Sequence, residues 1–556
     1  METFPYYWDL SFELFSFGRI IMAERKSGVL LHITSLPSTP GIGTLGKEAF
    51  RACDWIKKCG FSLWQVLPLG PTSYGDSPYQ SFSTFAGNPL LIDLDNLVER
   101  GWVEKSMIVP PEYIKCDTDV DYGSVVWWKM PLLYKCAEYF LAGCDKESRV
   151  KYEAFKNDNS SWLNNFADFT SIKKFYDEEA RKQGVSGVAS MWNQFWPKDL
   201  ASHDMTAVSK WDSEHVDDIE QIKAVQFFFW TQWSELKAYA NKNGIKIVGD
   251  IPIFVSGDSA DVWASRNLFQ YDENTLQQTC CAGVPPDYFS ATGQLWGNPL
   301  YDWDAMKKDN YSWWVKRIQN MLKLVDVVRI DHFRGFEAYW KIPAGAETAI
   351  GGEWIKGPGM DLFNEISKQL GKLPIIAEDL GLLTPEVEKL RDDTGFPGMK
   401  IIQFAFDSEK HEDEPSEWTN EYLPHTYKNT NCIVYTGTHD NDTTMGLIAS
   451  SDAQYKINVA KYFGLEENSS DLQLCDAMIR GAFMSSADTC IIPMQDVYRL
   501  GGEARMNTPS TMGSNWSWRI IFYTVLLHCV KVANFSCFYM VQNDGKKKLP
   551  SWRFLC

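Results

Sequence analysis

The chain alternates between short runs of apolar, β-branched residues and longer stretches in which apolar residues recur with helical spacing. In the segment 325–336, for example, Val325, Val327, Val328 and Ile330 are followed abruptly by charged residues. Such a continuous apolar run predicts a strand buried on both faces, as in a parallel sheet covered by helices. Eight runs fit this pattern, at 28–36, 62–69, 245–254, 325–336, 373–380, 399–406, 431–440 and 489–498.

Helical sequence separates each run from the next. The segment 47–58, for instance, carries Phe50, Cys53 and Ile56 on one side and ends before Gly60. Eight strand–helix repeats are the number that closes a (β/α)₈ barrel, and right-handed crossovers bring the carboxyl ends of all the strands to one face. A doubly wound open sheet is the alternative, but the glycine fingerprint that it usually carries is missing. The sequence therefore predicts the α/β class, with a (β/α)₈ TIM barrel.

Two regions are longer than an ordinary crossover, which needs about a dozen residues. Residues 99–215, between the second and third strands, are rich in charge and Trp, and we expect them to form an inserted, mostly helical subdomain, the largest insertion in the barrel. The segment 256–311 is expected to be a long loop beside the carboxyl ends of the strands. We expect residues 25–519 to form the barrel, whereas 1–24 is an atypical leader and 520–556 an atypical tail.

The charge balance narrows the choice of ligand. The chain has 72 acidic and 54 basic residues, a formal charge of −18, which argues against nucleic acid or an anionic membrane as the main partner. Its 23 Trp, 24 Tyr and 32 Phe provide aromatic faces suited to sugars or bases, although a large protein also needs many of them in its core. The 13 cysteines include no C-x-x-C pair, which indicates reduced thiols in an intracellular protein.

Charged side chains stand at the ends of several predicted strands. They are Asp250, Arg329, Asp331, Glu378, His439 and Asp440. A buried strand rarely ends in an acid for the sake of stability, because the carboxylate must be desolvated. Carboxylates that meet at one mouth raise one another's pKa and divide into acid and base roles. For Asp379 and Asp442, a capping or loop role is the preferred interpretation.

Several motifs resemble those of one enzyme family. RIDHFRGF, IIAEDLG and YTGTHDNDT are similar to barrel-strand motifs of the α-amylase superfamily. GVLLHITSLPS, SPYQSFSTFAGNP, GDIPIFV, QLWGNPLYDW and EARMNTPSTMGSNWSWR narrow the resemblance to the 4-α-glucanotransferases of glycoside hydrolase family 77, the amylomaltases or disproportionating enzymes. The resemblance covers residues 25–519, which it marks as the catalytic unit, with 256–311 as an active-site loop.

The resemblance assigns roles to the charged residues. It implies that Asp331 is the nucleophile, Glu378 the general acid/base and Asp440 the carboxylate that stabilises the transition state. Arg329 would keep Asp331 ionised. His332 is expected either near the site or packed as a loop histidine.

The resemblance also implies a set of sugar contacts. Asp250 and His439 would form hydrogen bonds with the sugar in the donor site, and Tyr79 would stack beneath that sugar. Gln294 and Trp296 would lie on a flexible loop over the acceptor side. From the sequence alone, ordinary loop packing explains Tyr79, Gln294 and Trp296 equally well.

The activity that the resemblance implies is transfer of α-1,4-glucan segments between malto-oligosaccharides, with glucose released from maltotriose. Two displacements through a glycosyl-aspartate would retain the α configuration, with the two carboxyl groups about 5 Å apart. No metal and no organic cofactor are expected, because carboxyl groups carry the protons. The expected partners are malto-oligosaccharides and glucans derived from starch or glycogen, not nucleic acid or membranes, and no oligomeric state is predicted. The expected location is the cytoplasm, or the plastid stroma if a targeted transcript exists.

Two alternatives stay open at this stage. An α-glucan hydrolase of the same superfamily would use the same carboxylates but release the intermediate to water. The segment after SNWSWR departs from the family pattern, so a folding-impaired or catalytically silent glucan-binding product is the second alternative.

Overall fold

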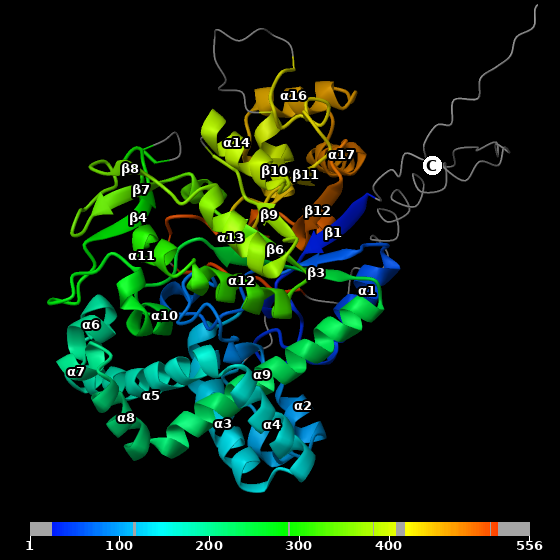
Figure 1. Ribbon diagram of the computed structural model, residues 1–556. Coiled ribbons are helices and arrows are strands. Elements are labelled where there is room, and N and C mark those ends of the chain that lie inside the picture. Colours follow the sequence, from blue (N-terminus) through cyan, green and yellow to red (C-terminus); the bar gives the residue numbers. More distant parts are fainter. Residues whose placement is uncertain are drawn as a thin grey trace, which may run out of the picture.

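The computed structural model describes residues 25–114, 118–286, 290–381, 383–406, 418–511 and 513–520. The predicted leader and the tail beyond Ile520 lie outside the described residues. Eight parallel strands form the central sheet, one from each predicted run (Figure 1). They are β1 (Lys26–Leu30), β2 (Leu63–Gln65), β3 (Lys246–Pro252), β6 (Val327–Asp331), β9 (Ile375–Ala377), β10 (Gly398–Ile401), β11 (Cys432–Tyr435) and β12 (Thr489–Pro493).

The sheet closes on itself as a barrel. Its ladder runs in the order β10-β11-β12-β1-β2-β3-β6-β9. Between β9 and β10, the Ala377 N–H donates to the Pro397 carbonyl at 3.0 Å. Asp379 accepts from the Met399 N–H at 2.7 Å and pairs with Arg391 at 2.6 Å, so this acid has the structural role that we preferred for it. We call this junction the β9–β10 seam.

Amphipathic helices cover the barrel. Along α1, Ala49, Ala52, Cys53 and Ile56 are buried, as a helical period requires. The helices that follow strands along the barrel are α1 (Lys47–Lys58), α12 (Ser312–Leu324), α13 (Met360–Leu370), α14 (Pro385–Thr394), α15 (Thr444–Ser450), α16 (Ala453–Tyr462), α17 (Asp471–Met484) and α18 (Met494–Tyr498). Shorter helices lie in the connections, namely α2 (Leu94–Glu99), α10 (Ala260–Ala264) and α11 (Trp303–Lys308).

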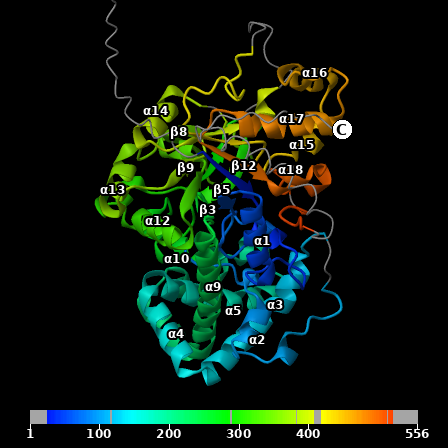
Figure 2. The same ribbon diagram turned by 90° about the vertical axis from the view of Figure 1, so that its right-hand side faces the viewer.

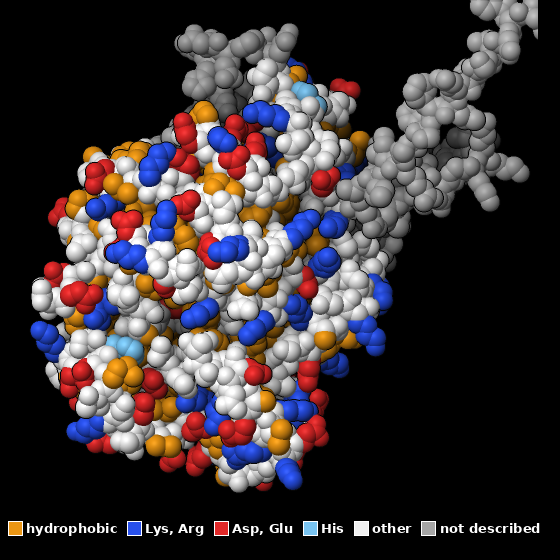
Figure 3. Space-filling model, in the orientation of Figure 1, with side chains coloured by type: hydrophobic (Ala, Val, Ile, Leu, Met, Phe, Trp, Pro, Cys, Tyr) orange, Lys and Arg blue, Asp and Glu red, His pale blue; other side chains and the backbone are white. Residues whose placement is uncertain are grey.

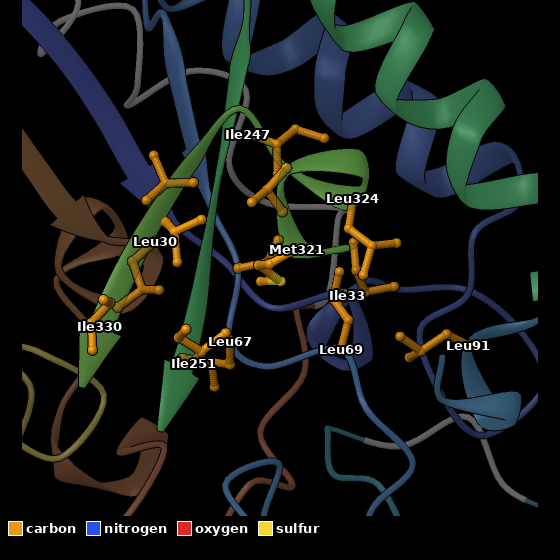
Figure 4. Packing of buried hydrophobic residues seen from close by; sticks show 14 of the residues in the cluster. Leu30, Ile33, Leu67, Leu69, Leu91, Ile247, Ile251, Met321, Leu324 and Ile330 are labelled. Carbon is orange, nitrogen blue, oxygen red and sulfur yellow. The ribbon is translucent and has the colours of Figure 1, made fainter. Parts of the chain in front are cut away.

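Close packing between strands and helices forms the core. Met321 and Leu324 of α12 lie beside Ile247 of β3 (Figure 4). The neighbouring Gly249 makes this approach possible, because a Cβ atom there would lie 2.5 Å from the Met321 Cε atom. A larger residue at this position would push α12 away from the barrel wall.

The predicted insertion is helical, but it does not end at a linker. It contains α3 (Tyr122–Gly143), α4 (Lys146–Asp158), α5 (Ser160–Lys182), α6 (Trp192–Phe195), α7 (Lys198–Ala201) and α8 (Met205–Glu214). The next helix, α9 (Val216–Lys242), begins among these helices and continues along the barrel (Figures 1 and 2). Near its end, the Trp233 indole N–H donates to the Leu324 carbonyl at 2.8 Å. One helix therefore belongs to both the insertion and the barrel.

The segment 256–311 is more regular than the loop that we expected. It contributes β4 (Cys280–Val284) and β5 (Gln294–Pro299) to a second, antiparallel sheet with β7 (Ala338–Pro343) and β8 (Glu353–Lys356). The strand order is β5-β4-β7-β8, and Figure 1 shows β4, β7 and β8 side by side. Tyr339 pairs with Ile355, and both pack against the main core. Trp340 pairs with Trp354, so these side chains lie on the opposite, outer face.

The surface carries charges of both signs. On the face shown in Figure 3, Lys and Arg side chains alternate with Asp and Glu. No helix in the described ranges is long and apolar enough to cross a bilayer.

Candidate active site

Three neighbouring barrel strands bring charged residues to one end of the barrel. Asp250 of β3 pairs in register with Arg329 of β6, and Ile330 of β6 pairs with Ala377 of β9. The next residues on those two strands are Asp331 and Glu378, which therefore lie on adjacent chains about 4.8 Å apart. The order of the barrel strands thus sets the two acids side by side.

Arg329 links two carboxylates inside the barrel. Its Nη1 atom lies 2.6 Å from the Asp250 Oδ2 atom and 3.1 Å from the Asp331 Oδ1 atom. These contacts confirm that Arg329 and Asp331 project from the same face of β6. Burial disfavours the charged guanidinium, but Asp250, Asp331 and other nearby groups outweigh burial and raise the pKa of Arg329 well above its ordinary value. Arg329 therefore stays charged at every accessible pH.

Asp331 lies at the mouth, with 29% of its side chain exposed. Burial raises the pKa of Asp331 to about 6, and Asp250 and Asp440 add to the rise, whereas Arg329 and His439 lower it. Arg329 thus acts in the expected direction, but it does not bring the pKa back to that of an ordinary aspartate. At neutral pH most Asp331 side chains are ionised.

Glu378 is held by backbone N–H groups on both sides. The His332 N–H donates to its Oε2 atom at 2.7 Å, and the Leu380 N–H donates to its Oε1 atom at 3.0 Å. Burial and the neighbouring Asp331 raise the pKa of Glu378 to about 8, against the lowering effects of Arg329 and the two N–H groups. At neutral pH most Glu378 side chains are therefore protonated, while most Asp331 side chains are not.

Tyr79, His439 and Trp516 form an aromatic cluster next to these acids. The Tyr79 and His439 rings are stacked, with centroids 4.9 Å apart, and Trp516 lies 5.7 Å from each. The Tyr79 hydroxyl donates to the Asp250 Oδ2 atom at 3.0 Å. The other oxygen of Asp250, Oδ1, is buried and has no hydrogen-bond partner among the described residues.

Asp440 lies in the loop after β11, with 47% of its side chain exposed. The Asn507 side-chain N–H donates to its Oδ1 atom at 2.7 Å, and Arg505 donates to its backbone carbonyl at 2.6 Å. The His439 Nε2 atom lies 3.4 Å from the same carboxylate. Asp440 therefore depends on a segment about 67 residues further along the chain.

Gln294 and Trp296 lie on β5, at the edge of the second sheet. The Trp296 indole N–H donates to the Gln294 Oε1 atom at 3.1 Å. The Trp296 ring meets the His332 ring edge to face, with centroids 4.8 Å apart. His332 has a left-handed backbone (φ 53°), and burial together with Arg334 lowers its pKa to about 3, so it is neutral at pH 7. This contact connects β5 to the residue that follows Asp331.

The structure brings all nine predicted site residues to the barrel mouth or its border. It adds Asn507, Arg505 and Trp516, which the sequence reasoning did not single out. All three lie in the quoted segment EARMNTPSTMGSNWSWR, whose polar and aromatic residues were the available signal. Within the described ranges, no three His, Cys, Asp or Glu side chains are arranged as metal ligands.

Comparisons with known proteins point to one family. A family model described as 4-alpha-glucanotransferase matches residues 31–523. A 4-alpha-glucanotransferase of Streptococcus pneumoniae serotype 4 is 46% identical over 500 residues, covering 90% of this chain and 94% of the relative. A chloroplastic/amyloplastic 4-alpha-glucanotransferase of Arabidopsis thaliana is 42% identical, covering 90% of this chain and 82% of the relative. Among solved structures, an amylomaltase from Streptococcus agalactiae in complex with acarbose aligns with a TM-score of 0.84 at 37% identity, covering 93% of this chain and 99% of that one.

Proposed function

The chain belongs to the 4-alpha-glucanotransferase family, glycoside hydrolase family 77, and from this premise we propose how its residues carry out the transfer. It is a glycosyltransferase that acts on α-1,4-glucans. Residues 25–519 form the catalytic unit in this proposal, and malto-oligosaccharides and glucans from starch or glycogen are its substrates. The proposed location is the cytoplasm, and the free thiols of the described cysteines support an intracellular site.

In the first step, Glu378 donates its proton to the glycosidic oxygen, and an Asp331 carboxylate oxygen attacks the anomeric carbon. The bond to the departing glucan breaks as the glycosyl-aspartate forms. At neutral pH the higher pKa of Glu378 keeps it mostly protonated, while Asp331 is mostly ionised. This difference supports the two roles, because Glu378 must donate a proton while Asp331 attacks as a carboxylate. The proposed separation of the carboxyl groups is about 5 Å, as in other retaining enzymes.

In the second step, the 4-hydroxyl of an acceptor glucan attacks the same carbon, and Glu378 takes the hydroxyl proton. Aspartate leaves, and two inversions retain the α configuration. Asp440 stabilises the positive charge that develops on the sugar ring in both steps. Arg329 and Asp250 hold Asp331 in place through the buried ion pairs described above.

The donor sugar is bound by Asp250, His439 and Tyr79 in this proposal. The unpartnered Oδ1 atom of Asp250 supports it, because a buried carboxylate oxygen without a donor is costly unless a ligand hydroxyl satisfies it. Gln294 and Trp296 flank the acceptor on the other side. An aromatic cover of this kind favours a glucan hydroxyl over water, because it positions the acceptor and excludes solvent.

One observation carries the mechanism: the N–H of His332, the residue next to Asp331, donates to the Glu378 carboxyl group. Burial and Asp331 raise the pKa of Glu378 to about 8, above the value of about 6 for Asp331, in keeping with its role as the proton donor. Incubation with maltotriose tests the proposal. Glucose and longer oligosaccharides should accumulate while the number of reducing ends stays constant. A steady rise in reducing ends would instead support the hydrolase alternative, and an absence of products would support the silent glucan-binding protein. Asp331→Asn should lose at least about 1,000-fold in kcat; near-normal turnover would refute the assignment of the nucleophile.

A further inference from the structure

An exposed tryptophan on the second sheet has a contact that the mechanism does not use. Trp354 of β8 is 39% exposed, although it is a large aromatic residue. The Arg334 guanidinium carbon lies 4.0 Å from the centre of its ring. Arg334 itself is buried, so it is a fixed support for one face of the indole. The ring is therefore held in one orientation while part of its surface stays open.

A second tryptophan makes a corner with the first. Trp340, opposite Trp354 on β7, meets it edge to face, with ring centroids 5.2 Å apart and an interplanar angle of 67°. The Trp340 indole N–H donates to the Ala349 carbonyl at 2.8 Å, which fixes its position. The adjacent Ile350 is 58% exposed, and hydrophobic side chains reach the surface over β7 and β8 (Figure 3). These residues form a rigid apolar surface outside the barrel core.

This surface is joined to the candidate site by short connections. Arg334 lies in the short 3₁₀ turn Phe333–Phe336, three residues after Asp331. The Gly359 N–H donates to the Phe336 carbonyl at 2.9 Å, and the Gly357 N–H donates to the Glu337 carbonyl at 2.8 Å. These bonds hold the end of β8 against the turn. A ligand at Trp354 would therefore be held at a fixed distance from the catalytic acids.

The exposed indole and the net charge of the protein indicate which class of ligand this surface binds. An indole face packs against apolar, flat groups, and the C–H faces of glucose units are such groups. Bases stack on aromatic rings as well, but a protein with a net charge of −18 repels a polyanion. A neutral glucan is not repelled by this charge, and it is the polymer on which this enzyme acts. A chain longer than the part bound at the catalytic acids continues over the surrounding surface.

We propose that Trp354, supported by Arg334 and flanked by Trp340, is a platform that binds an α-1,4-glucan chain outside the catalytic centre. The platform makes the enzyme favour long chains over short ones. This inference rests on the proposed function, because it assumes that the same glucan also occupies the site at Asp331.

The test compares substrates of two lengths in Trp354→Ala. Loss of the stacking surface should raise KM for maltoheptaose roughly five-fold more than KM for maltotriose. Trp354→Phe keeps a flat ring, so its ratio of the two KM values should lie between that of the unmodified enzyme and that of Trp354→Ala. Trp418→Ala is the matched control, since Trp418 is 41% exposed and also meets an aromatic ring, that of Tyr462, but lies elsewhere on the molecule. In this control the ratio of the two KM values should equal that of the unmodified enzyme.

Several outcomes would overturn the platform. Equal rises in KM for both substrates in Trp354→Ala and Trp354→Phe would mean that the tryptophan only supports the fold. Unchanged KM values for both substrates would mean that no glucan binds there. A dimer in sedimentation that dissociates in Trp354→Ala would assign the surface to a second copy of the chain. Failure of the unmodified enzyme to convert maltotriose would refute the proposed function itself, which separates the two tests.

Discussion

The charged residues on barrel strands and the residues around them are positioned by different means. Asp250, Arg329, Asp331 and Glu378, the strand group, stand on or directly after three adjacent parallel strands. Gln294, Trp296, Asp440 and Asn507, the border group, come from the second sheet and from loops. Strand register, buried ion pairs and backbone N–H groups fix the first group, whereas the second is held mainly by side-chain contacts such as that of Asn507 with Asp440.

The comparison relates the way a residue is held to the precision that its role needs. Groups that break and form bonds must be placed within fractions of an ångström, and regular strands are well suited to this. Groups that bind a flexible polymer tolerate more variation, and loops supply it at the border. Changes in the strand group should therefore abolish activity or stability, while changes in the border group should have smaller effects on turnover and on the choice of acceptor.

The largest expected effect is that of Glu378→Gln. Without a group that donates a proton to the leaving oxygen, kcat should fall by at least about 1,000-fold. Since the folded pKa of about 8 lies above the ordinary 4.5, Glu378 weakens the native fold as the pH rises from 4.5 to 8. The melting temperature of Glu378→Gln minus that of the unmodified enzyme should therefore increase as the pH rises over this range. Asp442→Asn, in the loop after Asp440, is the control and should remain active; equal losses in both would contradict the assignment.

Arg329→Met should chiefly affect stability. It leaves Asp250 buried without its cation, which should cost about 3–5 kcal/mol of unfolding free energy. Denaturant titration measures this loss. Lys389→Met removes an exposed ion pair with Asp393 and should change stability by less than about 1 kcal/mol. If Arg329→Met also loses less than about 1 kcal/mol of unfolding free energy, the ion pairs of Arg329 do not hold the strand group in place.

The pH profile of kcat/KM should be bell-shaped. Activity requires ionised Asp331, so it should fall as the pH drops through about 6, and it requires protonated Glu378, so it should fall as the pH rises through about 8. Each limb should approach a tenfold loss per pH unit. Melting temperatures measured at the same pH values distinguish this effect from unfolding. A flat profile from pH 5 to 9 would contradict this paired titration, because the range extends about one pH unit beyond each of the two pKa values.

Asn507→Ala tests the border group. The bond from Asn507 to the Asp440 carboxylate should contribute roughly tenfold to kcat/KM, because it orients a charged group at the site. Stability should change little, since Asp440 is half exposed. Asn515→Ala removes the hydrogen bonds of another asparagine in the same loop and serves as the control. If kcat/KM falls by the same factor in both variants, the loss comes from disorder of the loop and not from the missing bond to Asp440.

The smallest expected effect is that of Trp296→Ala. Loss of the indole should uncover the acceptor side and raise the share of hydrolysis relative to transfer by roughly two- to five-fold. The rate at which new reducing ends appear, divided by the rate at which glucose is released, measures this share. Leu295→Ala is the control, because Leu295 lies on the opposite face of the same strand and is 45% exposed. A shared effect would show that β5 is merely loosened.

The barrel and the strand group were predictable from the sequence because both depend on local pattern. Each barrel strand is a buried apolar run, and the charged residue at its end, such as Asp331 or Glu378, follows that run directly in the chain. Parallel register then brings these ends together without any further information.

The second sheet was missed because its strands have no such pattern. β8 reads EWIK and is mostly exposed, and β5 contains Gly297, Asn298 and Pro299, residues typical of loops. Their pairing depends on partners far along the chain. The same applies to Asn507, whose importance is evident only when its loop lies against Asp440. The continuity of α9 was also hidden, because a helix shared by two regions has the same period throughout.

The β9–β10 seam, where the two ends of the barrel's strand ladder meet, lies beside Glu378. Glu378 lies between Ala377 and Asp379, the two residues whose bonds close the ring there. A transient parting of these strands would displace the carboxyl group while the surrounding helices stayed intact. Turnover should thus respond to a disturbance of the barrel before the helical content does. On heating, the enzyme should lose activity at a temperature at which its helices are still folded.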